Sequence, residues 1–240
     1  MLNLNDRICL NINNPDLVKA IALARDFRCC TRTIKIGPAL FTECGSMVVH
    51  SFRELNICDI ILDTRYYLNL HEIWPCIESA LRLNLSAVTV NPFTDIKIIK
   101  ELIKASNTLL PRTGRVKPLN IIINANVINL NKTERIQFLR KLIQIADNLN
   151  ISLIVDYYDL PIIFKYNKNL TLLVGSKRPI SSNPLYDVNS EDKILPNIHD
   201  VITSGASYVI LDELLLSGNN EIMSDAVTRE IQLFSLGRKK

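Results

Sequence analysis

The chain has 240 residues, of which 48% are hydrophobic and 22% are charged, and its formal net charge is +4. This composition can supply a sizeable core and excludes an intrinsically disordered chain. The net charge is small and the basic residues form no stripe, so we expect no nucleic-acid partner. No window reaches the roughly 18 nearly uncharged apolar residues of a membrane span, and the start lacks the layout of a signal peptide, so we expect a cytoplasmic protein without a membrane partner.

Short apolar runs of strand length recur along the chain, separated by segments with helical periodicity. The runs are mostly continuous rather than alternating, which is typical of parallel strands buried on both faces. The predicted strands are Ile8–Ile12, Thr33–Gly37, Cys58–Leu62, Ser86–Asn91, Leu119–Asn124, Ile151–Asp156, Leu170–Val174 and Ala206–Leu211. The predicted helices are Asp16–Phe27, Ala39–Leu55, His71–Leu83, Asp95–Ser106, Asn131–Asn148, Asp159–Phe164, Pro196–Thr203 and Asn220–Leu236.

Eight strands that alternate with eight helices predict a (β/α)8 TIM barrel, formed as a single domain by residues 1–240. The competing fold is a doubly wound open sheet, which usually has a glycine-rich first turn. The first turn here, Asn11–Pro15, contains no glycine and so favours the barrel. Ser181–Leu195 is predicted to be a long loop, and a loop of that length is uncommon unless it is functional or disordered.

Polar residues at the carboxyl ends of the strands are the candidate site, because barrel enzymes place their chemistry there. Lys35 lies between Ile34 and Ile36, which should face the helices, so Lys35 should point into the barrel. A buried ammonium group is costly unless it is paired, and Asp63 is its natural partner. The pair is either a plain structural ion pair or part of a functional site.

Two further segments predict an anion-binding site. Asp63 and Arg65 should share one face of an extended strand, and together with Lys35 they could hold an anionic substrate. After the seventh strand, Gly175 and Arg178 resemble a phosphate-binding loop. The alternatives are a charge network without catalysis and an ordinary basic loop. We expect no metal site, because the Cys residues lack CxxC pairing and the three His residues lie far apart.

Segments along nearly the whole chain resemble the orotidine 5′-phosphate decarboxylase family. The runs that carry the resemblance are IKIGPALFTECG, DIILDTRYYLNLHEIWPCIESALRLNLSAVTVN, RPI after Gly175, and SGASYVIL. The resemblance implies a barrel that decarboxylates orotidine 5′-phosphate in de novo pyrimidine (UMP) biosynthesis. It also implies no metal or organic cofactor, and a homodimer in which one Asp of the Asp-x-Lys-x-x-Asp motif reaches across the interface.

The family's catalytic residues map onto four positions of this chain, and three of these are candidate catalytic residues here: Lys35, Asp63 and Arg65. Lys35 and Asp63 match the family's Lys and first Asp, and Arg65 stands where the catalytic Lys would be. In the family that Lys stabilises and protonates the carbanion left by the departing CO2. Leu68 stands where the final Asp would be.

The substrate-binding positions implied by the resemblance are Asn11, Asn129 and Arg178. Asn11 replaces an Asp that contacts the ribose, Asn129 falls near a residue that contacts the base, and Arg178 matches the phosphate Arg. Asp212 and Glu213 occupy the place of a Gly-Arg pair on the last strand. The implied ligand is orotidine 5′-phosphate or a UMP-like nucleotide.

These departures weigh against efficient decarboxylation, because an arginine stays protonated and is a poor proton donor to a carbanion. We therefore expect a homologue with weak or no decarboxylase activity. The alternatives are a non-catalytic barrel subunit that binds a partner, and a repurposed barrel that binds another phosphate ligand. A sister group, the sugar-phosphate decarboxylases and hexulose-phosphate synthases, fits less well, because this chain lacks the extra carboxylates of their metal site.

Overall fold

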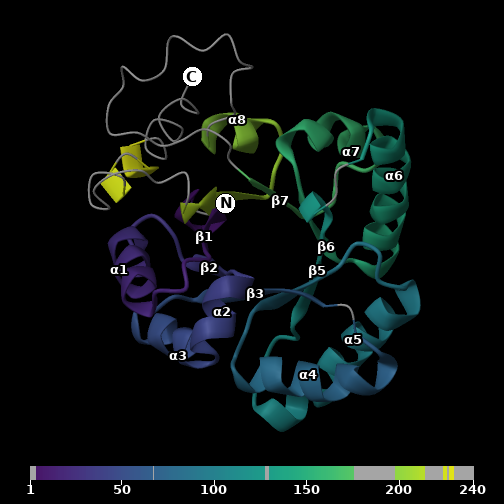
Figure 1. Cartoon of the computed structure of the whole chain (residues 1–240). Coiled ribbons are helices and arrows are strands. Elements are labelled where there is room, and N and C mark those ends of the chain that lie inside the picture. The colour runs from purple at the N-terminus through teal and green to yellow at the C-terminus, as the bar shows by residue number, and fades with distance from the viewer. Residues whose placement is uncertain are drawn as a thin grey trace.

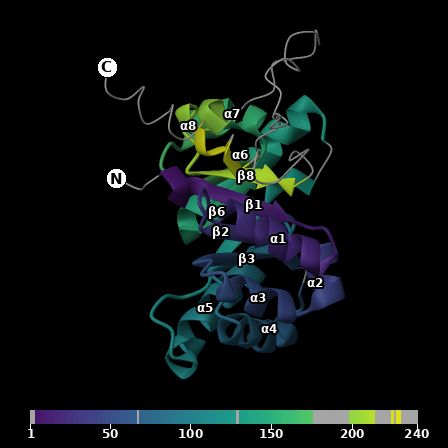
Figure 2. The same cartoon turned by 90° about the vertical axis from the view of Figure 1, so that its left-hand side faces the viewer.

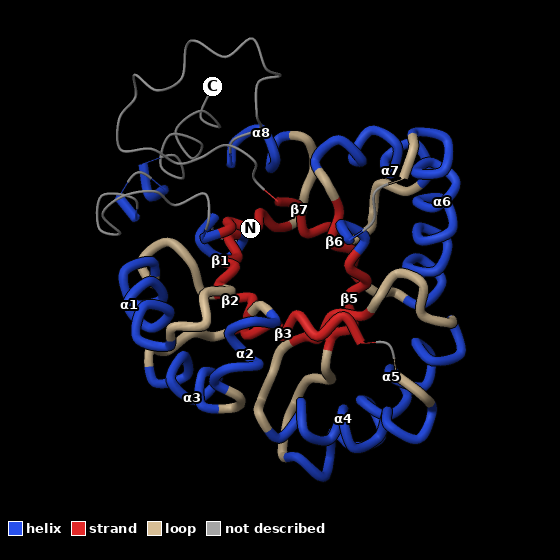
Figure 3. The backbone as a smooth tube through the Cα atoms, in the orientation of Figure 1, coloured by secondary structure: helices blue, strands red, loops and turns tan. Residues whose placement is uncertain are grey.

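The computed structural model of the chain describes residues 4–66, 68–127, 130–175, 198–213, 224–225 and 227–229. Within these residues, eight parallel strands close into a barrel in the order β1 to β8, with β8 paired to β1. Figures 1 and 3 look along the barrel axis and show the strands as an inner ring with the helices outside it. The predicted (β/α)8 TIM barrel is confirmed.

The elements follow one another along the chain as strand and helix in turn. The strands are β1 Ile8–Ile12, β2 Thr33–Ile36, β3 Asp59–Tyr66, β4 Ala87–Val90, β5 Asn120–Asn124, β6 Ser152–Val155, β7 Leu172–Gly175 and β8 Tyr208–Asp212. The helices are α1 Leu17–Phe27, α2 Pro38–Cys44, α3 Met47–Glu54, α4 Leu70–Arg82, α5 Ile96–Leu109, α6 Lys132–Leu149, α7 Leu160–Tyr166 and α8 Ile198–Thr203. Short 3-10 turns are η1 Leu4–Arg7, η2 Leu110–Thr113, η3 Ala125–Val127 and η4 Tyr157–Asp159.

All eight predicted strands are present, and β1 has the predicted bounds. One predicted helix was wrong: Ala39–Leu55 forms two helices, α2 and α3, rather than one. Gly45 adopts a φ of 56° and donates its N–H to the carbonyl of Phe41, which ends α2 as glycine commonly ends helices. Ser181–Leu195 and most of Asn220–Leu236 lie outside the described residues.

Two apolar layers hold the barrel together, one outside the strands and one inside them. Figure 2 shows the barrel from the side, with α1, α2 and α3 next to β1, β2 and β3. The larger one fills the space between the strands and the surrounding helices, and includes Ile34 and Ile36. The smaller one fills the barrel interior, with Cys9, Ile61, Ala87, Ile122, Ile154, Leu173 and Ile210. Because successive strand residues point to opposite faces, every strand except β2 contributes to both layers. The buried Thr33 and Lys35 alternate along β2 with Ile34 and Ile36, which belong to the larger layer. No helix among the described residues is long and apolar enough to cross a membrane.

The turn between α8 and β8 depends on a glycine. Gly205 has a φ of 101°, and a Cβ built on it would lie 2.6 Å from Cζ of Phe164 on α7. A Gly205→Ala variant would therefore carry both backbone strain and a steric overlap with a ring. We expect its free energy of unfolding to fall by about 2–4 kcal/mol, measured by urea denaturation.

The matched control is Gly114→Ala. Gly114 also has a positive φ, 69°, but nothing lies within 4 Å of the position of its Cβ. We expect this control to lose only about 1–2 kcal/mol, the cost of backbone strain alone. Equal losses in the two variants would contradict the role assigned to Phe164.

Candidate functional site

A layer of polar side chains lies above the apolar interior layer, at the carboxyl ends of the strands. It consists of Asn11 on β1, Lys35 on β2, Asp63 on β3, Thr89 on β4, Asn124 on β5 and Asp212 on β8. Five of these residues stand two positions after an apolar interior residue of the same strand, and Lys35 stands two positions after the buried Thr33. The alternation of strand side chains therefore directs them to the barrel interior, where they meet.

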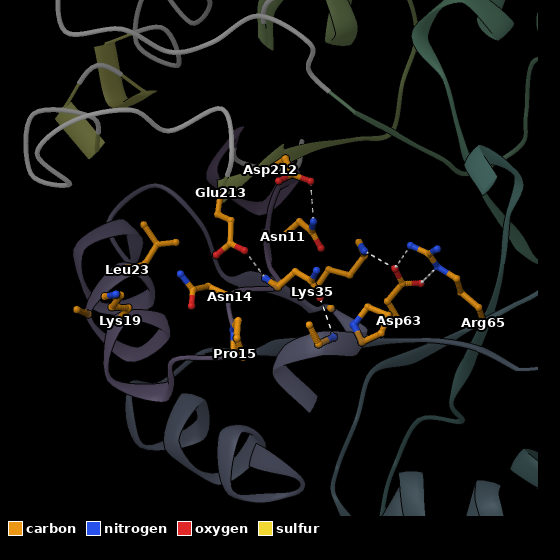
Figure 4. A pocket seen from close by; sticks show the side chains of 15 residues that line it. Asn11, Asn14, Pro15, Lys19, Leu23, Lys35, Asp63, Arg65, Asp212 and Glu213 are labelled. Carbon is orange, nitrogen blue, oxygen red and sulfur yellow. Dashed lines mark hydrogen bonds and ion pairs between the residues drawn. The ribbon is translucent and has the colours of Figure 1, made fainter. Parts of the chain in front are cut away.

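Asp63 is the centre of this layer. Its side chain is 1% exposed, and its Oδ2 lies 2.7 Å from Nζ of Lys35, whose side chain is 8% exposed. Nη2 of Arg65 lies 3.2 Å from the same oxygen, and Nε of Arg65 lies 3.4 Å from Oδ1. Figure 4 shows the ammonium and the guanidinium converging on the one carboxylate. The cluster thus carries two cations against one anion, with a net charge of +1.

Two uncharged residues complete the shell around Asp63. The hydroxyl of Thr89 donates to Oδ1 at 2.6 Å, and the amide of Asn124 donates to the same oxygen at 3.3 Å. Burial alone would raise the pKa of Asp63, but Lys35, Thr89 and Arg65 outweigh it and lower the pKa to about 2. At neutral pH Asp63 is therefore ionised and serves as a fixed charge rather than as a proton acceptor.

Arg65 reaches Asp63 by a backbone conformation that the sequence did not predict. The residue has a φ of 46°, in the left-handed region. The pairing between β3 and β4 is irregular between Leu62 and Tyr66. The predicted contact between Asp63 and Arg65 is present, but its predicted cause, a shared face of an extended strand, was wrong. The side chain instead folds back over Asp63 from a bulge.

The opposite wall of the site joins β8 to β1. Nδ2 of Asn11 donates to Oδ2 of Asp212 at 2.8 Å, and the backbone N–H of Asn13 donates to Oε1 of Glu213 at 2.8 Å. Burial, helped by the neighbouring Asp212, raises the pKa of Glu213 against the hydrogen bonds it accepts from the backbone. Oδ1 of Asn11 is buried and accepts no hydrogen bond from the described residues, so within this part of the chain the layer keeps one unused acceptor.

The start of α2 is fitted closely to this wall. Oδ1 of Asn13 accepts the backbone N–H of Ala39 at 2.9 Å and thereby satisfies a free donor of the first turn. A Cβ on Gly37 would lie only 2.2 Å from that oxygen. Gly37 is therefore required because the Asn13 side chain occupies the space that any other residue would need.

A cavity of about 730 Å³ opens between these two walls. Its lining includes Lys35, Asp63 and Arg65 on one side and Asn11, Asp212 and Glu213 on the other, with Lys19 of α1 at the rim. Figure 4 shows the two groups facing the same space. The first group can hold an anion, and the second can accept hydrogen bonds from hydroxyl or amino groups. The described residues contain no group of three or more His, Cys, Asp or Glu that could hold a metal.

The structure brings together four of the six predicted site residues: Asn11, Lys35, Asp63 and Arg65. Asn129 and Arg178 lie outside the described residues. Thr89 and Asn124 were not predicted, although each stands two positions after an apolar residue of a predicted strand. Applying that spacing to every strand would have found them. Asn91, the last residue of the predicted strand Ser86–Asn91, follows β4, and its Oδ1 accepts the N–H of Phe93 in the following loop.

Comparison with known proteins supports the fold and assigns no family. No protein-family model and no curated protein matches the chain. Among solved structures, it is similar to an uncharacterized conserved protein from Geobacillus kaustophilus, with a TM-score of 0.70 and 11% sequence identity. The match covers 93% of this chain and 99% of that chain. At this level of identity the likeness extends to the barrel alone.

Because the pKa of Asp63 is low, we expect the free energy of unfolding to depend on pH in the acid range. Folding lowers this pKa from 3.8 to about 2, so the carboxylate stabilises the folded chain above about pH 4. That contribution, on the order of 2 kcal/mol, should be lost as the pH falls from about 4 to about 2. Urea denaturation at a series of pH values measures it.

The control for this prediction is the double variant Lys35→Met/Asp63→Asn, which removes both charges of the buried pair. Its unfolding free energy should lack the part of the acid dependence that Asp63 supplies. The difference between the wild type and the control should therefore change between pH 4 and pH 2. Two parallel curves would contradict the lowered pKa.

Proposed function

We propose that the chain is a divergent homologue of orotidine 5′-phosphate decarboxylase, the carboxy-lyase of de novo pyrimidine biosynthesis, with weak or absent decarboxylase activity. The observation that carries the proposal is the buried Lys35–Asp63 pair, which places the two residues that match the family's motif 2.7 Å apart in a cavity at the barrel mouth. Four sequence segments support the same family. The ligand is orotidine 5′-phosphate or a UMP-like nucleotide, and no metal or organic cofactor is required.

The catalytic roles that this proposal gives to the cluster follow from its charges. Asp63 stays ionised and lies against the substrate carboxylate, while Lys35 and Arg65 stabilise the negative charge that remains on the pyrimidine carbon after CO2 departs. Protonation of that carbon is the weak step. A guanidinium group is a poorer proton donor than an ammonium group, so Arg65 supplies positive charge but is a poor source of the proton.

Two further departures lower the expected activity. Leu68, at the position of the family's final Asp, packs partly buried against the hydrophobic core and offers neither charge nor hydrogen bond. Asp212 and Glu213 place carboxyl groups at the wall where the family binds phosphate. One carboxylate about 6 Å from a phosphate charge costs roughly 3 kcal/mol at an effective dielectric of about 20. This cost acts on binding, before any chemistry.

The proposal also includes a homodimer, as the family resemblance implies, and a cytoplasmic location, as expected from the sequence. With Leu68 in place of the Asp that crosses the interface, the partner would add no charge from this position. Such a dimer could persist without catalysis, as a barrel subunit that binds a ligand or another protein. Turnover of orotidine 5′-phosphate distinguishes the catalytic function from this second one.

The first test is turnover of orotidine 5′-phosphate, followed by its loss of absorbance. We expect the wild type to be slow or inactive, and the Arg65→Lys/Leu68→Asp variant to be at least tenfold faster, because it restores the proton donor and the second carboxylate. Lys35→Ala should abolish any turnover. Rapid wild-type turnover that survives Lys35→Ala would contradict the proposed site.

The second test is binding of UMP, measured by titration calorimetry. We expect weak binding, and we expect the Asp212→Asn/Glu213→Gln variant to bind about 100-fold more tightly, since it removes two anions from the phosphate wall. Lys19→Gln, which removes a cation at the rim of the same cavity, is the matched control and should not tighten binding. Tight wild-type binding would contradict the argument from Asp212 and Glu213.

A further inference from the structure

We propose that Thr89 is the positioning residue of the site: its hydroxyl holds Arg65 in the left-handed conformation that brings the guanidinium over Asp63. Thr89 lies on β4, is completely buried and does not line the cavity described above. It therefore acts through its neighbours. This inference refines the proposed function, because it names the residue that sets the geometry of the cationic wall.

β3 forms a bulge opposite Thr89 of β4. Leu62 pairs with Val88 and Tyr66 pairs with Val90, so three residues of β3 lie opposite Thr89 alone. All three bond to it. The hydroxyl of Thr64 donates to its carbonyl at 2.7 Å, the backbone N–H of Arg65 donates to its Oγ1 at 2.9 Å, and its Oγ1 lies 2.6 Å from Oδ1 of Asp63.

The direction of these hydrogen bonds is fixed by chemistry. A backbone N–H can only donate, so the hydroxyl oxygen accepts from Arg65. An ionised carboxylate can only accept, so the hydroxyl hydrogen must point to Asp63. One hydroxyl group thus links the strained backbone of Arg65 to the carboxylate that its own side chain contacts.

This link explains how a non-glycine residue keeps a positive φ. Such a conformation is unfavourable for a residue with a side chain and persists only where the surroundings determine it. Without the hydroxyl, the N–H of Arg65 would lose its acceptor, and the backbone could relax toward an extended strand. The guanidinium would then leave Asp63, and the cavity would lose one of the two cations of that wall.

The test compares Thr89→Val, which keeps the shape of the side chain and removes the hydroxyl, with Thr89→Ser, which keeps the hydroxyl. The first readout is the pKa of Asp63 from a carbon-13 NMR titration of its carboxyl group. Thr89→Val should raise this pKa by about 1, because a donor to the charged form is lost and Arg65 moves away. Thr89→Ser should restore the wild-type value.

The second readout is the dissociation constant of UMP, which should rise about tenfold in Thr89→Val and stay unchanged in Thr89→Ser. The matched control is Thr94→Val, since Thr94 is also buried and its hydroxyl donates to the backbone of Tyr66 rather than to Asp63. It should change neither readout. If Thr89→Val does not fold, Thr89→Cys replaces it, because the thiol is only a weak donor.

The two readouts separate this inference from the proposed function. A wild type that binds no UMP would refute the nucleotide site, while the pKa of Asp63 would still decide the role of Thr89. An unchanged pKa in Thr89→Val, or a Thr89→Ser variant that behaves like Thr89→Val, would overturn the positioning role. A raised pKa in Thr94→Val would overturn it as well, since a general loosening of the strand would then explain the effect.

Discussion

The buried ion pair between Lys35 and Asp63 is the interaction on which the rest of the site depends. Removing two charges from water costs several kcal/mol for each, and their attraction offsets this only when the geometry is good and the remaining polar atoms find partners. The barrel supplies those partners from neighbouring strands. Arg65, Thr89 and Asn124 all donate to the same carboxylate. The polar layer is held together because the buried charge of Asp63 needs these donors from the neighbouring strands.

Much of this arrangement could be predicted from the sequence, because the alternation of strand side chains determines which residues face inward. Ile34 and Ile36 pack toward the helices as expected, and Lys35, which lies between them, therefore points into the barrel interior. The same rule orders the interior layer below it. The break between α2 and α3 could not be predicted from helical periodicity, since a turn at Gly45 interrupts the helix without changing the apolar pattern.

Thr89 and Asn124 show what periodicity leaves undetermined. A single Thr or Asn within an apolar run is compatible with an ordinary strand, and its importance depends on which residues the neighbouring strand places opposite it. That register is set by the closure of the whole barrel. Arg65 shows the same limit for backbone conformation, because only the bulge opposite Thr89 makes a positive φ at this residue understandable.

The contact between Asn11 and Asp212 bears on how the protein folds. These two residues are separated by 201 positions in the chain, yet their side chains share a hydrogen bond where β1 meets β8. Bringing such distant segments together carries a large loop-closure entropy, so contacts of this kind form slowly in folding. One wall of the cavity consequently forms only when the last strand joins the first. A partly folded barrel would hold the Lys35–Asp63 pair but would lack the opposite wall, so ligand binding would report the complete closure of the fold.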